Sequence, residues 1–372
     1  MKIPPQDDKV FRGQFVVGAV DATPAPGARR LQIDQLAVDI FPGLTTTTVS
    51  DSTGRSIGLL LGTPIDLDDG VVLPDGGNYQ VDAAATDDID TFVERHIYRL
   101  AGSFVFILDT PSARRIYLDA NGSLSLVFDP ARHVAAATTG LLLSDEEYVD
   151  RFEADLYAAF DVDHEGWFTG GLTAHRGIRR LLCNHYLDCE TSQVVRHWPL
   201  KAVSEATSTT STIAQINQHV LSTTQALIKT APFAVALTAG NETRAMLANY
   251  RYIHDQLTFV TLDAPGYRLD LERAKELARM FDLKHVILPH RSASPAGVES
   301  WQYRVGHNIT GNNMAGHPTI APLAGQYFIG GLGGEVGRGF LWLGTDNDSG
   351  IDALSIIDRL KLPRHPLIVE EV

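Results

Sequence analysis

Hydrophobic residues follow different spacings in the two halves of the chain. In the first half, short apolar runs bounded by turn residues predict β-strands at 103–108, 116–118 and 124–128, with further strand material up to residue 195. Asn121-Gly122, between two of these runs, predicts a tight hairpin. Residues 144–160 begin with a capping serine and two acidic residues and predict one helix. The first half is therefore expected to be β-rich.

The second half alternates between strand and helix patterns. Apolar runs predict strands at 233–237, 257–262 and 285–288, and helical periodicity predicts helices at 213–229, 242–252 and 269–281. This alternation is typical of a parallel sheet covered on both faces, which binds ligands at the carboxyl ends of its strands. A polar, Ser- and Thr-rich stretch precedes it. We therefore expect a first domain at 1–200, a linker at 201–212 and a second domain at 213–372.

Composition narrows the class of protein. The chain has 372 residues, 44% of them hydrophobic, and a formal net charge of −14. These values argue against disorder, against a sequence-independent nucleic-acid binder and against docking on anionic lipid. No apolar run is long enough to span a membrane, and the N-terminus lacks a signal peptide, so a cytoplasmic protein is expected. The two cysteines, Cys183 and Cys189, are too few for a disulfide scaffold, and their spacing fits no zinc site.

Candidate chemistry lies where the first strand of the second half ends. The residues 238–243 read Thr-Ala-Gly-Asn-Glu-Thr and lead directly into a helix. Small residues allow a tight turn, and the free N–H groups of the helix start favour an anion. Glu242 is placed to hold Mg²⁺ that bridges phosphate oxygens. The segment is not a Walker A loop, and an ordinary capped strand–turn–helix junction is the plain alternative.

This segment resembles the pyrophosphate loop of the asparagine synthetase family, Ser-Gly-Gly-x-Asp-Ser. A second segment, 331–335 (Gly-Leu-Gly-Gly-Glu), resembles that family's Gly-Glu-Gly-x-Asp-Glu block, shortened by one residue. In the first half, 100–106, 118–123, 184–187 and 197–199 resemble motifs of its glutaminase-like domain. The resemblance therefore covers most of the chain in the family's order.

The resemblance implies a fold of mixed α/β and α+β class. A degenerate Ntn-glutaminase-like β-sandwich would precede a doubly wound, parallel-sheet ATP-pyrophosphatase domain of the HUP-like type. It implies ATP and Mg²⁺ as cofactors, small-molecule carboxylate and amine substrates, and an acyl-adenylate intermediate. The residues expected to bind ATP are Thr238, Ala239, Gly240, Asn241, Glu242, Thr243, Asp263 and Gly333. Glu242 and Glu335 are the expected metal ligands, and Glu335 and Arg338 the expected catalytic residues.

Several departures from the family pattern change the expected activity. Position 2 is Lys2, where family glutaminases carry a nucleophilic cysteine, so the chain is closer to the β-lactam synthetase-like branch and is not expected to hydrolyse glutamine. Leu332 replaces an acidic residue expected near the acyl-adenylate, which argues against asparagine as the product. The family continues further beyond its second block, so we expect a second domain truncated at its C-terminus.

Three functions remain open from the sequence. The first is an ATP-dependent, AMP- and pyrophosphate-forming amide-bond synthetase. The second is a non-catalytic nucleotide-binding or scaffold member of the family, and the third, less favoured, is asparagine synthesis. The substrates and the oligomeric state, with a homodimer among the options, are also left open.

Overall fold

The computed structural model describes residues 3–6, 9–82, 88–164, 166–202, 206, 208–309, 312–331 and 352–372, which form a mixed α/β protein with parallel and antiparallel sheets. The chain divides into two compact units. The first unit contains Met1–Glu205, Pro295–Gly311 and Pro363–Val372, and the second contains Ala206–Ser294 and Asn312–Leu362. The sequence places everything after residue 212 in one domain, whereas two later segments belong to the first unit. Tyr303 is one reason, because it is buried there beside Tyr148, with ring centroids 4.8 Å apart.

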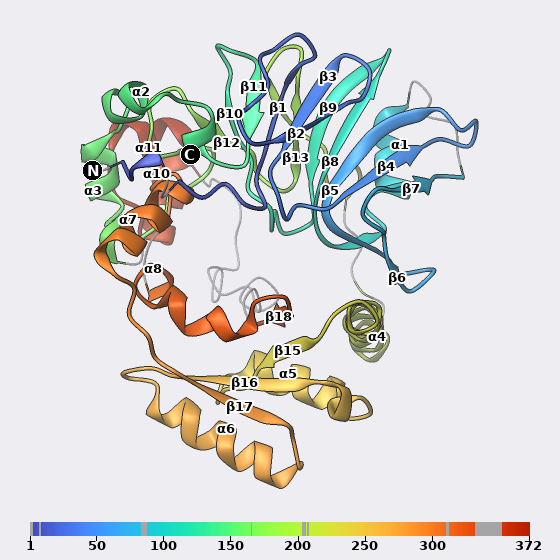
Figure 1. The fold of residues 1–372 in the computed structure, drawn as a ribbon, viewed down its shortest axis with the longest axis vertical. Coiled ribbons are helices and arrows are strands. Elements are labelled where there is room, and N and C mark those ends of the chain that lie inside the picture. Colours follow the sequence, from blue (N-terminus) through green and yellow to red (C-terminus); the bar gives the residue numbers. More distant parts are fainter. Residues whose placement is uncertain are drawn as a thin grey trace. The chain divides into compact units, whose positions relative to one another are not determined.

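Two β-sheets form the first unit (Figure 1). The six-stranded sheet has the order β12-β10-β11-β1-β3-β2, with β1 Phe15–Ala19, β2 Arg29–Gln32, β3 Leu36–Ile40, β10 Val127–Asp129, β11 Val134–Ala136 and β12 Arg179–Arg180. The eight-stranded sheet has the order β14-β13-β9-β8-β5-β4-β7, with β6 paired to β5. Its strands are β4 Thr46–Ser50, β5 Ser56–Asp66, β6 Val71–Val72, β7 Gly77–Gln80, β8 Leu100–Thr110, β9 Ala113–Leu118, β13 His185–Asp188 and β14 Val194–Arg196. Neighbouring strands are antiparallel except for β4 and β7.

Alternating side chains build separate hydrophobic layers on the two faces of these sheets. Val17 and Val38 of the six-stranded sheet pack with Leu59 and Ile107 of the eight-stranded sheet, which makes the core between them. Leu60, one residue further along β5, points to the opposite face and packs in a second core with α1 (Ile89–His96). This period of two is the expected result of a strand with apolar layers on both faces.

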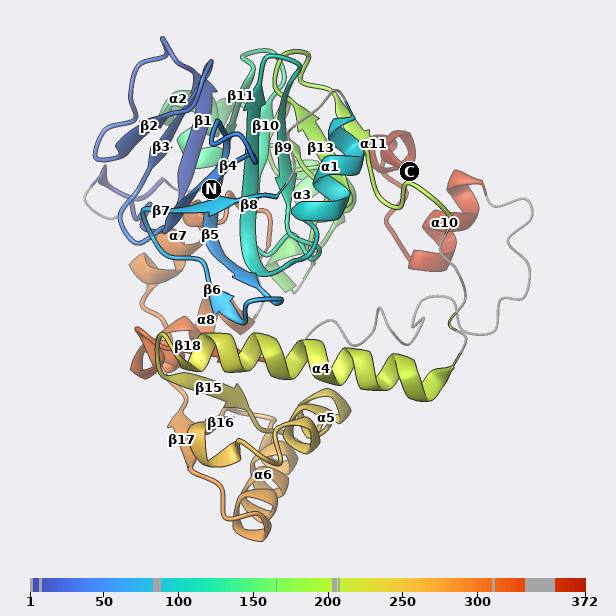
Figure 2. The same cartoon turned by 90° about the vertical axis from the view of Figure 1, so that its right-hand side faces the viewer.

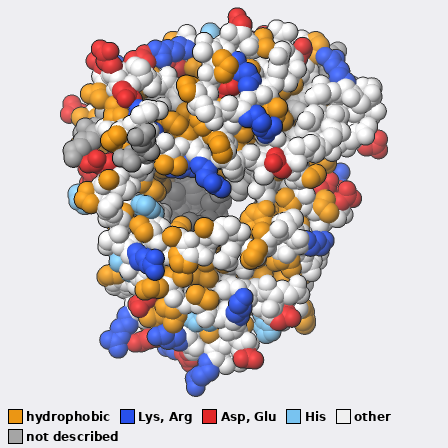
Figure 3. Space-filling model, in the orientation of Figure 1, with side chains coloured by type: hydrophobic (Ala, Val, Ile, Leu, Met, Phe, Trp, Pro, Cys, Tyr) orange, Lys and Arg blue, Asp and Glu red, His pale blue; other side chains and the backbone are white. Residues whose placement is uncertain are grey.

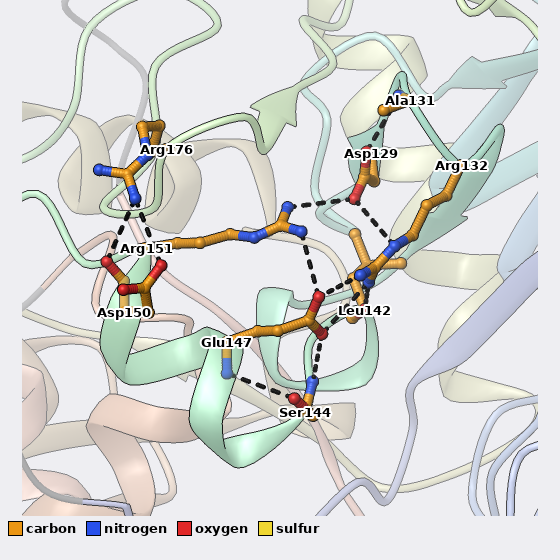
Figure 4. A network of polar contacts seen from close by, with 9 residues as sticks. All are labelled: Asp129, Ala131, Arg132, Leu142, Ser144, Glu147, Asp150, Arg151 and Arg176. Carbon is orange, nitrogen blue, oxygen red and sulfur yellow. Dashed lines mark hydrogen bonds and ion pairs between the residues drawn. The ribbon is translucent and has the colours of Figure 1, made fainter.

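Helices cover the outer face of the six-stranded sheet. They are α2 (Asp145–Asp150) and α7 (Pro295–Arg304), which pack on it through Tyr148 and Tyr303. This unit also contains α3 (Ala154–Ala159), the short helices η2 (Thr139–Leu141) and η3 (Val162–His164), and the C-terminal α11 (Pro366–Glu371). Glu147 of α2 completes a capping box with Ser144 and binds both Arg132 and Arg151 (Figure 4). Both arginines also face the buried Asp129, so this network ties α2 to the β10–β11 turn.

Two sequence predictions for this unit are wrong. The single helix predicted at 144–160 is divided into α2 and α3, because Phe152 between them forms a β-bridge with His175 and the next amide N–H, of Glu153, donates to Ala174. The hairpin predicted at Asn121-Gly122 is absent, since β9 and β10 belong to different sheets. This turn instead carries the chain from one sheet to the other, and the buried Asp119 carboxylate stabilises it. The carboxylate accepts hydrogen bonds from the backbone N–H groups of Phe104, Asn121 and Ser123 and from the Ser123 hydroxyl.

A four-stranded parallel sheet forms the centre of the second unit, with the order β17-β16-β15-β18. Its strands are β15 Phe233–Ala236, β16 Thr258–Asp263, β17 His285–Pro289 and β18 Tyr327–Ile329. The helices are α4 Thr209–Ile228, α5 Asn241–Asn249, α6 Arg268–Met280, α8 Asn312–Gly316 and α10 Ala353–Leu360, with η4 His254–Gln256 and η5 His317–Leu323. The predicted parallel sheet is therefore present, with the three strands and three helices that the sequence predicted.

Helices pack around this sheet in the second unit. Figure 2 shows α4 as a long helix beside α5, where the hydroxyls of Thr224 and Tyr250 lie 2.9 Å apart. Leu323 of η5 packs on Ala234, Val260 and Leu288, three residues that share one face of the sheet. Part of the expected linker is helical, because Ser208 caps α4 and accepts a hydrogen bond from the Ser211 N–H group.

Candidate nucleotide-binding loop

The end of β15 turns directly into α5 and leaves a short loop at the carboxyl edge of the sheet. The Leu237 N–H group still bonds to the Val260 carbonyl oxygen at 2.8 Å, so the strand pairing extends to the edge of the loop. Gly240 is the N-cap of α5, with φ −63° and ψ 152°, and offers no side-chain cap. The first turn of this helix therefore depends on neighbouring groups or on a ligand to satisfy its N–H groups.

Two threonine hydroxyls close this loop on itself. The Thr238 and Thr243 side-chain oxygens lie 2.9 Å apart, and the Gly240 N–H group donates to the Thr238 oxygen at 3.0 Å. Thr243 also donates toward the Gly240 carbonyl at 3.2 Å and is 5% exposed. The structure thus brings together Thr238, Gly240 and Thr243, as the sequence predicts, in one compact turn.

An aspartate that sequence reasoning missed also contacts the loop. The Asp270 carboxylate, in the first turn of α6, accepts a hydrogen bond from the Ala239 N–H group at 2.8 Å. An acidic residue in a first helical turn is common and stabilises the helix dipole, so its position in the sequence carries no special signal. Only the pairing of β15 with β16 brings α6 next to this loop. Asp270 therefore fixes one N–H group that a phosphate would otherwise approach.

Gly331, the first residue of the second family-like segment, lies beside the loop at this edge. The strand β18 pairs with β15, and Gly331 follows it by two residues. A Cβ atom added to Gly331 would lie 3.0 Å from the Glu242 Cβ atom and 3.1 Å from the Thr243 Cγ2 atom. Glycine at 331 therefore allows the chain to pass close to the start of α5. Gly333, Glu335 and Arg338, with Leu332, lie outside the described residues.

The strand order places this meeting point at a topological switch. Along the chain β15, β16 and β17 are added in one direction, whereas β18 is added on the opposite side of β15. In open parallel sheets, ligands bind where the order reverses, outside the carboxyl ends of the strands. Asp263 ends the neighbouring strand β16 at the same edge and is exposed. Asn241 is also exposed and accepts a hydrogen bond from Arg244 at 2.5 Å.

A buried polar contact connects the end of β15, where the loop begins, to β16 and β17. The Thr261 hydroxyl donates to the Leu237 carbonyl oxygen at 2.7 Å and lies 2.8 Å from the His285 Nε2 atom. Burial lowers the pKa of His285, with a smaller contribution from the charge of Lys275. A neutral His285 bonded to Thr261 therefore links β17 to the start of the loop.

The described residues do not form a complete metal site. Glu242 is half-buried at the start of α5, and within the described ranges no three His, Cys, Asp or Glu side chains gather closely enough to bind a metal ion. Mg²⁺ usually takes one or two protein carboxylates and fills its octahedron with water and substrate phosphates. A Mg²⁺ ion at this edge would therefore take most of its ligands from water and a bound nucleotide.

Other sequence predictions bear on the surface and the cysteines. Every helix in the described part of the chain is too short or too polar to cross a lipid bilayer. Basic and acidic side chains are interspersed on the face shown in Figure 3. Cys183 and Cys189 form no disulfide, and burial raises the pKa of the Cys189 thiol to about 12. Such a thiol is a poor nucleophile at neutral pH.

Comparison with known proteins gives no family assignment. No protein-family model and no curated protein sequence matches this chain.

Proposed function

We propose that this protein is a Mg·ATP-dependent amide-bond synthetase of the asparagine synthetase type. In the proposed reaction a substrate carboxylate attacks the α-phosphorus of ATP, and the bond to pyrophosphate breaks. An amine then attacks the acyl-adenylate, which releases AMP and a proton. The first unit would serve as a degenerate Ntn-glutaminase-like sandwich, and the second as a HUP-like ATP-pyrophosphatase domain. Glutamine hydrolysis is not part of the proposal, because Lys2 stands where the cysteine nucleophile is expected.

One observation carries this proposal: the Thr238–Thr243 loop and Gly331 meet at the switch point of a parallel sheet. A hydroxyl-lined turn at a helix start favours a polyanion, because the helix dipole and directed N–H groups both stabilise negative charge. Pyrophosphate is the leaving group whose growing charge such a turn would stabilise. In this role Thr238, Gly240 and Thr243 would hold the phosphates, and Glu242 would hold Mg²⁺.

Asp270 favours a second candidate, a nucleotide-binding member of the family without catalysis. Its carboxylate already accepts the Ala239 N–H group, so one phosphate-directed donor is used inside the protein. An internal anion beside the loop also repels a phosphate at close range. This arrangement would give less stabilisation to the charge that grows on a leaving pyrophosphate, so a bound nucleotide would not turn over.

Calorimetric titration with a non-hydrolysable ATP analogue tests the binding part of the proposal. We expect micromolar binding to the wild type in the presence of Mg²⁺, and at least about tenfold weaker binding to Glu242→Ala, since charge-assisted contacts contribute about 1.5–3 kcal/mol. The difference in affinity between the wild type and Glu242→Ala should shrink when Mg²⁺ is removed. Glu146→Ala is the matched control, because Glu146 is an exposed glutamate of the first unit. No binding to the wild type at millimolar analogue would overturn the proposal.

Pyrophosphate release separates the two candidates. The wild type is incubated with Mg·ATP and a panel of carboxylates, with and without amines. Carboxylate-dependent pyrophosphate that is lost in Glu242→Ala supports the synthetase. Analogue binding without pyrophosphate release across the panel supports the non-catalytic candidate, and glutamate formed from glutamine would contradict the absence of a glutaminase.

A further inference from the structure

A cavity of about 520 Å³ lies in the first unit, within the size range of small-molecule sites. Its floor is the outer face of the six-stranded sheet. Val16 and Gly18 of β1 line it, whereas Val17 between them belongs to the core between the sheets. Gly18 pairs with Ala37 of β3, and these two small residues leave the floor open. The cavity is separate from the proposed nucleotide site, and the inference below does not rest on that site.

Most of the cavity wall is apolar. The lining residues of this kind include Phe11, Phe41, Leu141 and Leu143, with the proline-rich segment 24–26 on another side. An apolar wall of this extent favours a ligand with a hydrocarbon or aromatic body, since its transfer from water is favourable. The polar groups of the cavity then decide which head group such a ligand carries.

Two of the four charged lining residues are fully engaged with each other. Arg30 donates to both carboxylate oxygens of Asp39, at 2.7 and 2.9 Å, and a third hydrogen bond comes from the Ala25 N–H group at 2.7 Å. Arg30 also donates to the Ala22 carbonyl oxygen at 2.5 Å. This pair holds the 22–26 segment on the sheet and has little capacity left for a ligand.

Lys9 is different, because its side chain is only 7% exposed while its counter-ion Asp145 is 60% exposed. Its Nζ atom lies 2.5 Å from the Asp145 Oδ1 atom and 5.3 Å from the centroid of the Tyr303 ring. Among the described residues, Asp145 is the one hydrogen-bond acceptor of this ammonium group, which has three N–H donors. One protein acceptor therefore meets a group with three N–H donors, which leaves donor capacity for a ligand.

We propose that this cavity binds a small molecule with an apolar body and a carboxylate group, and that the Lys9 ammonium group binds the carboxylate. A carboxylate provides acceptors for the remaining ammonium donors in charge-assisted hydrogen bonds. The small floor residues leave room for the apolar body beneath the 22–26 segment. An amine or a neutral alcohol of the same shape lacks the matching charge.

Octanoate is the test probe, and octan-1-ol is the same chain without the carboxylate. Calorimetry on the whole 372-residue chain should give one octanoate per chain and clearly weaker binding of octan-1-ol. Lys9→Met keeps an unbranched side chain but removes the ammonium group, and we expect affinity for octanoate to fall at least about tenfold. Lys201→Met is the matched control, because Lys201 is exposed. Octanoate should bind this variant as it binds the wild type.

A second variant adds bulk to the cavity floor without changing Lys9. A Cβ atom added to Gly18 would lie 3.8 Å from the Val134 Cγ2 atom and 3.9 Å from the Ala22 Cβ atom, both ordinary contacts. Gly18→Val should therefore fold, as circular dichroism can check, and bind octanoate more weakly. If Lys9→Met does not fold, Gly18→Val decides. Octanoate binding that is absent from the wild type, unchanged in either variant, or matched by octan-1-ol overturns the proposal.

Discussion

The side-chain oxygens of Thr238 and Thr243 lie 2.9 Å apart and tie the end of β15 to the first turn of α5. The contact holds the loop through the protein's own side chains, so a phosphate would meet a preorganised turn. Preorganisation reduces the entropy that binding must overcome. Removal of the threonine pair should therefore lower both the free energy of unfolding and the affinity for a phosphate ligand.

Thr243→Val should remove this contact while it keeps the shape of the side chain. Thr243 is buried, so we expect the free energy of unfolding to fall by about 1 kcal/mol, measured by urea denaturation. Affinity for the ATP analogue should fall as well. Thr258→Val is the matched control, because Thr258 lies at the amino end of the neighbouring strand β16, away from the loop. Equal analogue affinity in both variants would remove Thr243 from the site.

Gly331→Val should disturb the loop from the side of β18. The added Cβ atom would lie 3.3 Å from the Thr243 backbone nitrogen as well as close to Glu242, so the start of α5 has to shift. We expect a loss of about 1–3 kcal/mol in stability and weaker analogue binding, measured by denaturation and calorimetry. At Gly330 an added Cβ atom has no neighbour within 4 Å, so Gly330→Val serves as the control. Equal effects of the two substitutions would contradict the close approach.

Glu147→Gln should lower the stability of the first unit at neutral pH and reduce the loss of stability as the pH falls. The hydrogen bond from Arg132, followed by that from the Ser144 N–H group, lowers the pKa of Glu147 to about 2 from its ordinary value of 4.5. A carboxylate with a lowered pKa stabilises the folded state above its unfolded pKa, and this contribution is lost as the pH falls from about 4.5 toward 2. The glutamine variant lacks this contribution.

Denaturation curves between pH 7 and pH 2 measure this difference. Glu146→Gln, at the adjacent exposed position, controls for the loss of one negative charge. The wild type and Glu146→Gln should show the same fall in stability at acid pH. A Glu147→Gln curve parallel to theirs would contradict the assigned role of the Arg132 contact.

His175→Phe should make the stability of the first unit less sensitive to mild acid. Burial, and then repulsion from His307, lowers the pKa of His175 to about 3 from 6.5. The unfolded chain therefore binds the proton more readily, and the wild type loses stability as the pH falls from about 6.5 toward 3. One such group changes stability by at most about 1.4 kcal/mol per pH unit. Thermal melts at pH 8 and pH 5 check this expectation.

Phenylalanine keeps the aromatic contact that His175 makes with Tyr148, whose ring centroid lies 4.1 Å away. His219→Phe, on the exposed surface of α4, is the control and should leave the pH dependence unchanged. A His175→Phe protein with the same pH dependence as the wild type would show that this buried histidine does not couple folding to protons.

The sequence alone determined three strands and three helices of the second unit and the position of its loop, but not β18 or the short helices. Strand and helix periods differ clearly there, because each strand is short and apolar and each helix has a regular spacing of buried residues. Alternation then requires parallel strands, whose carboxyl ends share one edge. The segment 238–243 follows the first strand directly, so its place at that edge could be predicted from local patterns.

Tertiary structure decided what depends on contacts between distant residues. The 144–160 segment has a helical pattern, but Phe152 pairs with His175 and divides the helix. Asn121-Gly122 has hairpin residues, but Asp119 directs the turn between two sheets. Asp270 reaches the loop only because β16 lies beside β15. The Lys9 side chain is buried where it contacts Asp145 of α2 and Tyr303 of α7. Local propensity cannot encode such pairings, since their free energy comes from residues that lie close together only in the folded chain.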